Sequence, residues 1–431
     1  MVLRLHSKDA TFSQDFSALL HASRDAQDDV RAVVLDILAD VRRRGDTALR
    51  EYTKRFDRID MTASTMKVTT SEIETAWQQC QQETLDALYV AAKRIEDFHH
   101  RHLPTDDSLT DKEGVALGVR WTAVEAAGLY VPGGKASYPS SVLMNAIPAK
   151  VAGVERIVMV VPAPDGVLNP LVLAAAKLAG VTEIYKIGGA QAVAALAYGT
   201  ETIQPVDIIT GPGNAFVAEA KREVFGTVGI DMVAGPSEIL VVADNKNDPQ
   251  WIAIDLLSQA EHDEVAQSIL ITDDADYATM VEAAVENQLS TLPRASIARK
   301  SWEDHGVVIV VDDLRNAPPL INKLAPEHLE LAVDSPDTIL ADTRNAGSIF
   351  LGRHTPEAIG DYVAGPNHVL PTARSARFSS GLSVLNFMKR STLIQCSAAS
   401  LERIGPAAIT LAEAEGLHAH ARSIDIRLTD R

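Results

Sequence analysis

The chain has 431 residues, of which 46% are hydrophobic and 23% are charged, and this composition excludes a disordered chain, a collagen and a coiled-coil rod. Its 58 acidic residues outnumber its 40 basic ones, and the formal net charge of −18 disfavours nucleic acid and anionic membranes as partners. At roughly 100–200 residues per domain, this length predicts two to four domains.

The absence of targeting signals and the small number of cysteines limit the cellular location and the kinds of metal site that this protein can have. No run approaches the ~18 apolar residues of a membrane helix, and the first residues lack the apolar core of a signal peptide, so we expect a cytoplasmic protein without a membrane partner. The two cysteines, Cys80 and Cys396, form no CxxC pair. This excludes a disulfide framework and a cysteine-based metal centre, so imidazole, carboxylate or amide groups must hold any metal.

The N-terminal part of the chain predicts helices. Residues 1–23 carry no strong pattern, whereas apolar residues at 30–41 follow helical spacing and Gly45 ends that helix. Ser71 and Glu74 form a capping-box signature, and the helix behind them runs to about residue 98. Three histidines follow, His99, His100 and His102. A metal cluster is conceivable there, but we favour histidines that suit the dipole at a helix C-terminus.

The middle of the chain alternates strands with helices in two series. The first series predicts strands at 126–131, 157–161, 183–187 and 206–210. The second predicts strands at 239–243, 268–272, 307–311 and 348–351. Alternation at these lengths indicates an α/β fold with two doubly wound, Rossmann-like domains, although no GxGxxG fingerprint occurs. Small helical segments are expected at both termini, with residues 383–425 helical and a break at Gly405-Pro406.

Three predicted strands end in glycine-rich segments, which are Gly128–Gly134, Gly188–Gln191 and Gly211–Asn214. Glycines at such positions let backbone N–H groups approach a ligand, and ligands of open α/β sheets bind beyond the carboxyl ends of strands. Together the three segments favour a nucleotide-like ligand, although each one alone is better explained by a tight turn.

Several polar motifs could carry chemistry. Gln259 and His262 stand three residues apart on one helix face and can present an amide and an imidazole to one point, although an exposed turn explains them too. Glu327 and His328 are an adjacent carboxylate and imidazole that can divide acid and base roles. The loop from Gly360 to Pro371 is a candidate binding loop, with Asp361 and His368 as its chemical groups.

Two weaker motifs complete the set. Ser237 follows a Gly-Pro turn without the GxSxG context of a nucleophile, so we expect it to act through hydrogen bonds. In the segment from Glu415 to His420, spacing alone pairs Glu415 with His418, and a solvated helix end is the simpler interpretation.

Taken together and in this order, these motifs resemble those of the histidinol dehydrogenase family. The resemblance runs from Arg44-Gly45-Asp46 to the terminal helices. It implies zinc ligands at Gln259, His262, Asp361 and His420. The resemblance thus selects His420, whereas residue spacing alone favoured His418. It implies a catalytic pair in Glu327 and His328. The substrate contacts that it implies are Ser237, His368 and Glu415, together with His328 and the four zinc ligands.

The same resemblance implies NAD as the cofactor, held by Tyr130, Gln191 and Asn214. The implied reaction is the four-electron oxidation of L-histidinol to L-histidine through L-histidinal, at the end of histidine biosynthesis. It also implies an intertwined homodimer in which Glu415 and His420 reach the partner's site. Two alternatives are a related dehydrogenase for another alcohol and a zinc-stabilised binding protein without turnover.

We expect this chain to divide into four parts. Residues 1–23 form an N-terminal arm, and residues 24–130 and 236–372 form a first α/β domain with the metal and catalytic residues. Residues 131–235 form a second α/β domain on the NAD side, and residues 373–431 form a helical dimerisation arm.

Overall fold

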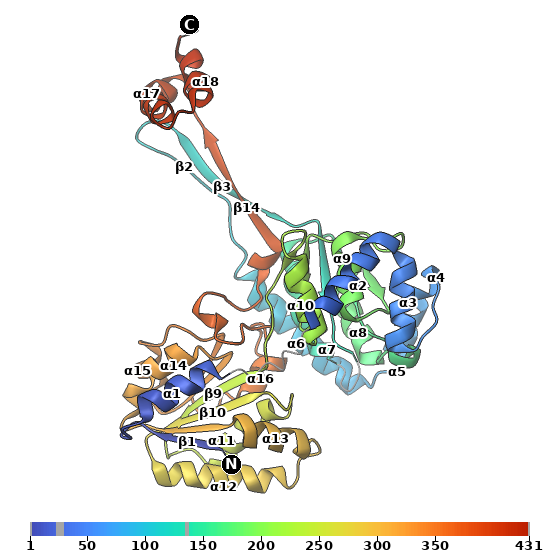
Figure 1. Ribbon diagram of the computed structural model, residues 1–431, viewed down its shortest axis with the longest axis vertical. Coiled ribbons are helices and arrows are strands. Elements are labelled where there is room, and N and C mark those ends of the chain that lie inside the picture. Colours follow the sequence, from blue (N-terminus) through green and yellow to red (C-terminus); the bar gives the residue numbers. More distant parts are fainter. Residues whose placement is uncertain (1, 23–29, 134–137, 430–431) are drawn as a thin grey trace.

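The computed structural model describes residues 2–22, 30–133 and 138–429, and it shows two α/β units and a long arm (Figure 1). The strands of these residues form a six-stranded, a five-stranded and a three-stranded sheet. Gly134, the last residue of the first glycine-rich segment, lies outside the described residues. No helix within the described ranges is long and apolar enough to cross a membrane.

The five-stranded sheet is parallel and has the strand order β6-β5-β4-β7-β8. Its strands are β4 (Ala126–Tyr130), β5 (Arg156–Val160), β6 (Glu183–Tyr185), β7 (Ile208–Thr210) and β8 (Gly229–Ile230). Counted along the chain this order is 3-2-1-4-5, the order of a doubly wound sheet. The intervening helices are α7 (Pro139–Ala152), α8 (Pro170–Ala179), α9 (Gly189–Tyr198) and α10 (Ala215–Val224).

Local sequence determines where these helices begin and end. At α8, the Asn169 side chain accepts a hydrogen bond from the backbone N–H of Leu171, and Pro170 occupies the first turn. Gly180 ends the helix with φ of 79°, a conformation that disfavours residues with a Cβ.

The six-stranded sheet is also parallel, with the order β1-β11-β10-β9-β12-β13. Its strands are β1 (Leu3–His6), β9 (Glu238–Ala243), β10 (Gln267–Thr272), β11 (Val307–Val310), β12 (His328–Ala332) and β13 (Ser348–Leu351). Its helices are α1 (Phe12–His21), α11 (Pro249–Ala260), α12 (Ala275–Leu289), α13 (Ala295–His305), α14 (Pro318–Leu324), α15 (Pro336–Leu340) and α16 (Glu357–Tyr362). Without β1 the order is again 3-2-1-4-5, so both units wind in the same way.

The N-terminal helices pack on the five-stranded sheet, which differs from the expected grouping of residues 24–130 with 236–372. These helices are α2 (Val30–Arg44), α3 (Asp46–Asp57), α4 (Ala63–Met66), α5 (Thr70–Gln79) and α6 (Gln82–His100). Val34 shares one core with Val158, and Ile95 shares another with Val142. An amphipathic pattern shows that a helix has a buried face but not which sheet covers that face.

The N-terminal segment 1–23 also differs from the expected arm. Its residues Leu3–His6 form β1, which pairs with β11 at the edge of the six-stranded sheet. Further along the chain, the capping box lies at Thr69 and Glu72 and not at Ser71 and Glu74. The expected single long helix is two helices, α5 and α6, because Cys80 adopts an extended conformation.

The C-terminal arm is a β-ribbon with two helices, so the expectation of helix throughout 383–425 was wrong for its first part. Strand β14 (Met388–Gln395) pairs antiparallel with β3 (Ala116–Ala123), which also pairs with β2 (Asp107–Thr110). The helix α17 (Ala398–Ala414) continues through Pro406, and α18 (His418–Thr429) follows it. Single 3-10 turns lie at Pro164–Gly166, Leu314–Asn316, Ser375–Arg377 and Val384–Phe387.

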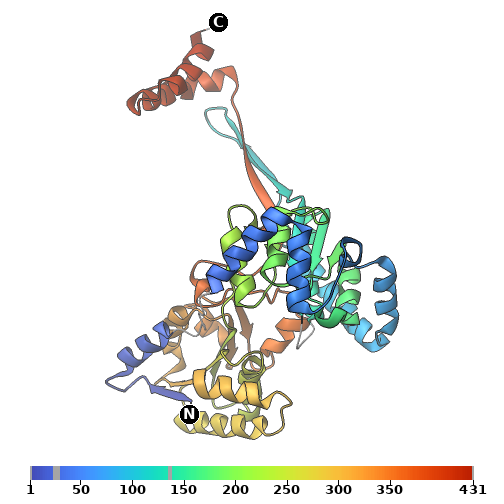
Figure 2. The same ribbon diagram turned by 45° about the vertical axis from the view of Figure 1, so that its right-hand side comes forward.

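The arm extends away from both α/β units in two views (Figures 1 and 2). It exposes large apolar side chains, including Leu109, Leu393, Ile394 and Leu411, of which Ile394 is 71% exposed. A projecting ribbon with exposed apolar residues is typical of a surface that another chain covers.

A buried ion pair holds the glycine-rich segment that follows β7. The Lys221 ammonium donates to the Gly211 carbonyl at 2.9 Å, and the Gly211 N–H donates to the Asp231 carboxylate at 2.8 Å. Lys221 and Asp231 form an ion pair with side chains 3% and 1% exposed. Gly211 has φ of 110°, and a Cβ there would lie 2.1 Å from the Tyr130 carbonyl oxygen. The pair therefore anchors a peptide that can only be glycine.

Replacing Lys221 by Met leaves the Asp231 carboxylate buried without its cation. We expect this variant to lose about 3–5 kcal/mol of the free energy of unfolding, measured by urea denaturation. The control is Lys300→Met, which removes one partner of the exposed Lys300–Asp304 pair and should leave that free energy nearly unchanged. Similar losses in the two variants would contradict a role for burial.

Candidate active site

The predicted catalytic residues gather at the amino-terminal edge of the six-stranded sheet. Glu238 and His328 are the first residues of the neighbouring strands β9 and β12, and Glu327 directly precedes β12. The end of α11 and the short helix α16 contribute Gln259 and the residues Glu357 and Asp361. Most ligands of open α/β sheets bind at the opposite edge, so the position of this site was not predicted from the sequence.

His328 is held as a neutral imidazole with one defined tautomer. Its Nδ1 lies 3.0 Å from the Glu238 carbonyl oxygen, which can only accept, so Nδ1 carries the proton. Its Nε2 therefore presents a lone pair, and it lies 3.7 Å from Asp361 Oδ1. Burial lowers the pKa of His328 to about 3, so the ring is neutral.

Glu327 is hydrogen-bonded to the backbone N–H of Glu238, whereas His328 is bonded to the carbonyl of the same residue. Its Oε2 accepts a hydrogen bond from the Glu238 backbone N–H at 2.9 Å, and the side chain is buried. The same oxygen lies 3.7 Å from His328 Nδ1. One residue of β9 thus positions both members of the Glu–His pair through its backbone.

The side-chain amide of Gln259 is hydrogen-bonded to both Glu357 and Glu238, through its nitrogen and its oxygen. Its Nε2 donates to Glu357 Oε1 at 2.7 Å, and its Oε1 accepts from the Glu238 N–H at 2.8 Å. The side chain is 1% exposed. His262 lies two residues beyond the end of α11 and is exposed.

Asp361 and His368 meet at the loop that follows α16. His368 Nδ1 donates to the Asp361 backbone carbonyl at 3.0 Å, and His368 Nε2 lies 3.3 Å from the Ser141 hydroxyl, which donates to it. Burial raises the pKa of the Asp361 carboxyl to about 7 and lowers that of His368 to about 4. Ser237 is the residue directly before β9.

The donor groups of the site suit a metal ion that prefers nitrogen and oxygen. One ligand atom each from His328, Glu357 and Asp361 lie within 4.8 Å of one another. Within the described ranges, His328 Nε2 and Glu357 Oε2 are buried without a hydrogen-bond partner. Burial and the neighbouring carboxylates, Asp361 first among them, raise the pKa of Glu357 well above its usual range. A bound cation would compensate these crowded carboxylates.

The three residues predicted to hold NAD lie at the carboxyl edge of the five-stranded sheet. Tyr130 ends β4, and its hydroxyl accepts a hydrogen bond from the Gly189 N–H at 3.0 Å. Gln191 is buried in the first turn of α9, and its Oε1 has no hydrogen-bond partner among the described residues. Asn214 caps α10 at the end of β7, the strand beside β4. Tyr130 and Asn214 thus lie at the ends of two adjacent strands, at the switch point of the sheet, and Gln191 follows β6 at the same edge.

Glu415 and His420 do not reach the site of their own chain. Glu415 ends α17 and His420 lies in α18, both exposed on the arm that projects from the two units (Figures 1 and 2). His418 is exposed on the same segment. The alternative ligand His418 and the implied ligand His420 therefore both lie on the arm, away from the two units that carry the other candidate ligands.

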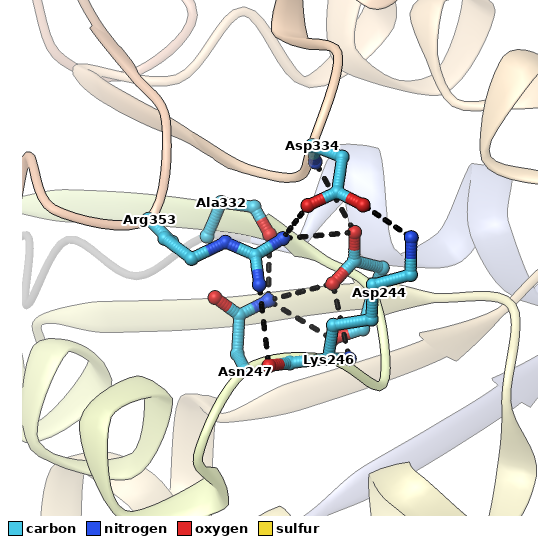
Figure 3. A network of polar contacts seen from close by, with 6 residues as sticks. All are labelled: Asp244, Lys246, Asn247, Ala332, Asp334 and Arg353. Atoms are coloured by element: carbon cyan, nitrogen blue, oxygen red, sulfur yellow. Dashed lines mark hydrogen bonds and ion pairs between the residues drawn. The ribbon is translucent and has the colours of Figure 1, made fainter.

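The carboxyl edge of the six-stranded sheet is closed by ion pairs (Figure 3). Arg353 pairs with Asp334 and lies 3.5 Å from Asp244, and Lys246 also pairs with Asp334. The Asn247 amide donates to the Ala332 carbonyl at 2.7 Å. These contacts link the ends of β9 and β12, so side chains of the unit itself occupy this part of its usual ligand edge.

Sequence reasoning missed Glu238, Glu357 and Glu330. Glu357 stands four residues before Asp361, a spacing that places both on one helix face, and this signal could have found it. Glu238 acts through its backbone N–H and carbonyl, and the identity of a residue does not show what its backbone groups will bind. Glu330 stands two residues after His328, on the same face of a strand that the sequence analysis did not predict.

The chain combines a dinucleotide-type sheet with a buried acid–base pair, and it belongs to the class of NAD-dependent oxidoreductases. The family model for histidinol dehydrogenase matches residues 20–428. A histidinol dehydrogenase from Rhodospirillum rubrum is 65% identical over 429 residues, and one from Rhizobium meliloti is 64% identical over 428 residues. Each alignment covers 99% of both chains.

A solved structure agrees with these relatives. The crystal structure of histidinol dehydrogenase from Elizabethkingia anophelis is 38% identical, with a TM-score of 0.95, and the match covers 100% of this chain and 98% of that one. This chain is a member of the histidinol dehydrogenase family.

Proposed function

We propose that this chain oxidises L-histidinol to L-histidine through L-histidinal, with zinc in the site and two NAD+ used in turn. The observation that carries the proposal is the Glu327–His328 pair, fixed on the backbone of Glu238 beside the carboxylates of α16. Membership of the family supports the substrate. We place the reaction in the cytoplasm, because a chain with only two cysteines fits a reducing compartment.

Gln259, His262, Asp361 and the partner's His420 would hold the zinc ion. When bound, zinc would orient the substrate and polarise its oxygen. Their amide, imidazole and carboxylate groups are donors that zinc accepts. Gln259 and Asp361 lie on elements that meet at Glu357, which brings their side chains to one region of the site.

His328 acts as the first base. Its Nε2 lone pair would take the proton of the substrate alcohol, and NAD, when bound, would supply the hydride acceptor. Its Nδ1–H donates to the Glu238 carbonyl, so the ring is oriented before the substrate arrives.

Glu327 acts as the second base. Its carboxylate removes a proton from the water that attacks the aldehyde, and the hydrate then releases the second hydride. The Glu238 N–H donates to Oε2 of this carboxylate and so orients it before water arrives.

Substrate and cofactor would meet between the two units. Ser237 and His368 would contact the substrate from one chain, and Glu415 of the partner would complement its cationic amine. Tyr130, Gln191 and Asn214 would hold the dinucleotide, whose phosphates backbone N–H groups at the glycine-rich strand ends can bind. Local N–H groups must do this because the net charge of −18 repels an anion.

The arm supports a homodimer in which each site needs both chains. Glu415 and His420 lie on the projecting arm, and His262, another expected zinc ligand, is exposed on the body of the chain. The apolar side chains of the ribbon would be covered by the second copy.

The four-electron reaction predicts two NADH for each histidinol consumed when NAD+ is in excess. We expect a chelator to abolish turnover and added zinc to restore it. The measurement is absorbance of NADH against substrate consumed. One NADH per histidinol would mean that the aldehyde step is absent, and turnover that persists after complete metal removal would contradict the zinc site.

Glu327→Gln should slow the oxidation of histidinal by about 10²-fold or more and slow that of histidinol much less. The amide oxygen still accepts from the Glu238 N–H, so the side chain keeps its place but cannot remove a proton. Rates are measured separately with histidinol and with histidinal. His328→Asn is the matched variant, because it keeps a donor to Glu238 and should slow the first oxidation. Equal losses in both steps for Glu327→Gln would exclude the assigned role.

His262→Ala and His420→Ala should each be inactive alone but regain activity when mixed. A mixed dimer pairs the intact body of one chain with the intact arm of the other, so after subunit exchange about a quarter of the sites should be complete. The measurement is specific activity after unfolding and refolding the mixture together. The two variants refolded apart and then combined serve as the control, and a mixture that stays inactive would show that His420 does not act in the partner's site.

A further inference from the structure

Glu330 is a buried carboxyl that the mechanism does not use. It lies on the same face of β12 as His328, because alternate residues of a strand point to the same side of a sheet. Its side chain is 2% exposed. The neighbouring Leu329 and Leu331 face the other side and belong to an apolar core there. A carboxyl at this depth is stable only with hydrogen-bond partners.

Glu330 has two partners, on two different helices. Its Oε1 accepts a hydrogen bond from the Glu357 backbone N–H, the first N–H of α16. Its carboxyl also hydrogen-bonds the Asp255 side chain on α11. Burial raises the pKa of both acids, which keeps a proton in the pair for that bond. Glu330 therefore ties the strand of the catalytic histidine to the helices of Gln259 and Asp361.

The helix α16 depends on this contact because it has no cap of its own. Its N-cap residue is Pro356, and no side chain of that residue can bind the free N–H groups. The helix has only six residues, so few internal hydrogen bonds hold it in place. It nevertheless carries both Glu357 and Asp361 into the site.

We propose that Glu330 is a positioning residue for the metal site: by holding the first N–H of α16, it places Asp361 and Glu357 opposite His328 and so sets the affinity for zinc. The inference rests on the proposed function, since zinc is the ion of that site. It concerns the strength of binding and not the identity of the ligands, because Glu330 itself faces Asp255 and the backbone of Glu357.

The test is the zinc affinity of the intact chain after its metal has been removed, measured by competition with a chromogenic chelator. Glu330→Leu keeps a side chain of similar size but leaves the Glu357 N–H without an acceptor, and we expect its affinity to fall 10–100-fold. Glu330→Gln should bind zinc nearly as tightly as the wild type, because its amide accepts from Glu357 and donates to Asp255.

Two more variants separate positioning from general damage. Glu330→Asp keeps the acid but shortens its reach, so a drop in affinity is expected there too, and it decides the matter if Glu330→Leu does not fold. Glu219→Leu removes another buried glutamate, which pairs with Arg222 on α10 in the other unit. It should lower the free energy of unfolding while leaving the zinc affinity unchanged.

The outcomes distinguish this inference from the function on which it rests. Wild-type affinity in Glu330→Leu or Glu330→Asp would overturn the positioning role alone, and so would equal losses in Glu330→Gln and Glu330→Leu. A wild-type chain that binds no zinc would overturn both proposals. Loss in Glu330→Leu and Glu330→Asp, with retention in Glu330→Gln and Glu219→Leu, supports the positioning role.

Discussion

The backbone of Glu238, at the amino end of β9, is the point on which the active site depends. Its carbonyl fixes the tautomer of His328, and its N–H binds Glu327 and Gln259. Glu238 is in register with Gln267 of β10, and the next residue, Ile239, is in register with His328 of β12, so this backbone segment has little freedom to move. The residues that do chemistry are thus attached to the most rigid part of the unit, which is how a site avoids reorganisation during the reaction.

The two units use the same winding order for different purposes. In the five-stranded unit, the carboxyl ends of β4 and β7 carry Tyr130 and the Gly211 segment, the usual position for a dinucleotide. In the six-stranded unit, the corresponding carboxyl ends are filled by the ion pairs of Arg353, and the polar site lies at the opposite edge. A nucleotide-type edge of one unit and an amino-terminal edge of the other can therefore serve one reaction.

The sequence predicted the α/β class, most strands of both series and the polar side chains that the structure gathers around His328. It did not predict β12, because Glu327-His328 resembled a turn, nor β14, whose side chains are nearly all exposed and show no alternation of buried and exposed residues. It also grouped the N-terminal helices with the wrong sheet. In each case the local pattern was present, but the partner that decides its meaning lay far away in the chain.

The sequence by itself determined the chemical groups: two cysteines, and a set of imidazoles, carboxylates and amides whose motifs identify the family. Only the tertiary structure decided how those groups work together. It placed the Glu–His pair on a backbone residue, joined Glu330 to an uncapped helix, and left Glu415 and His420 on an arm directed away from their own chain. The physical reason is that hydrogen bonds between backbone groups and distant side chains depend on strand order and packing, which residue spacing does not encode.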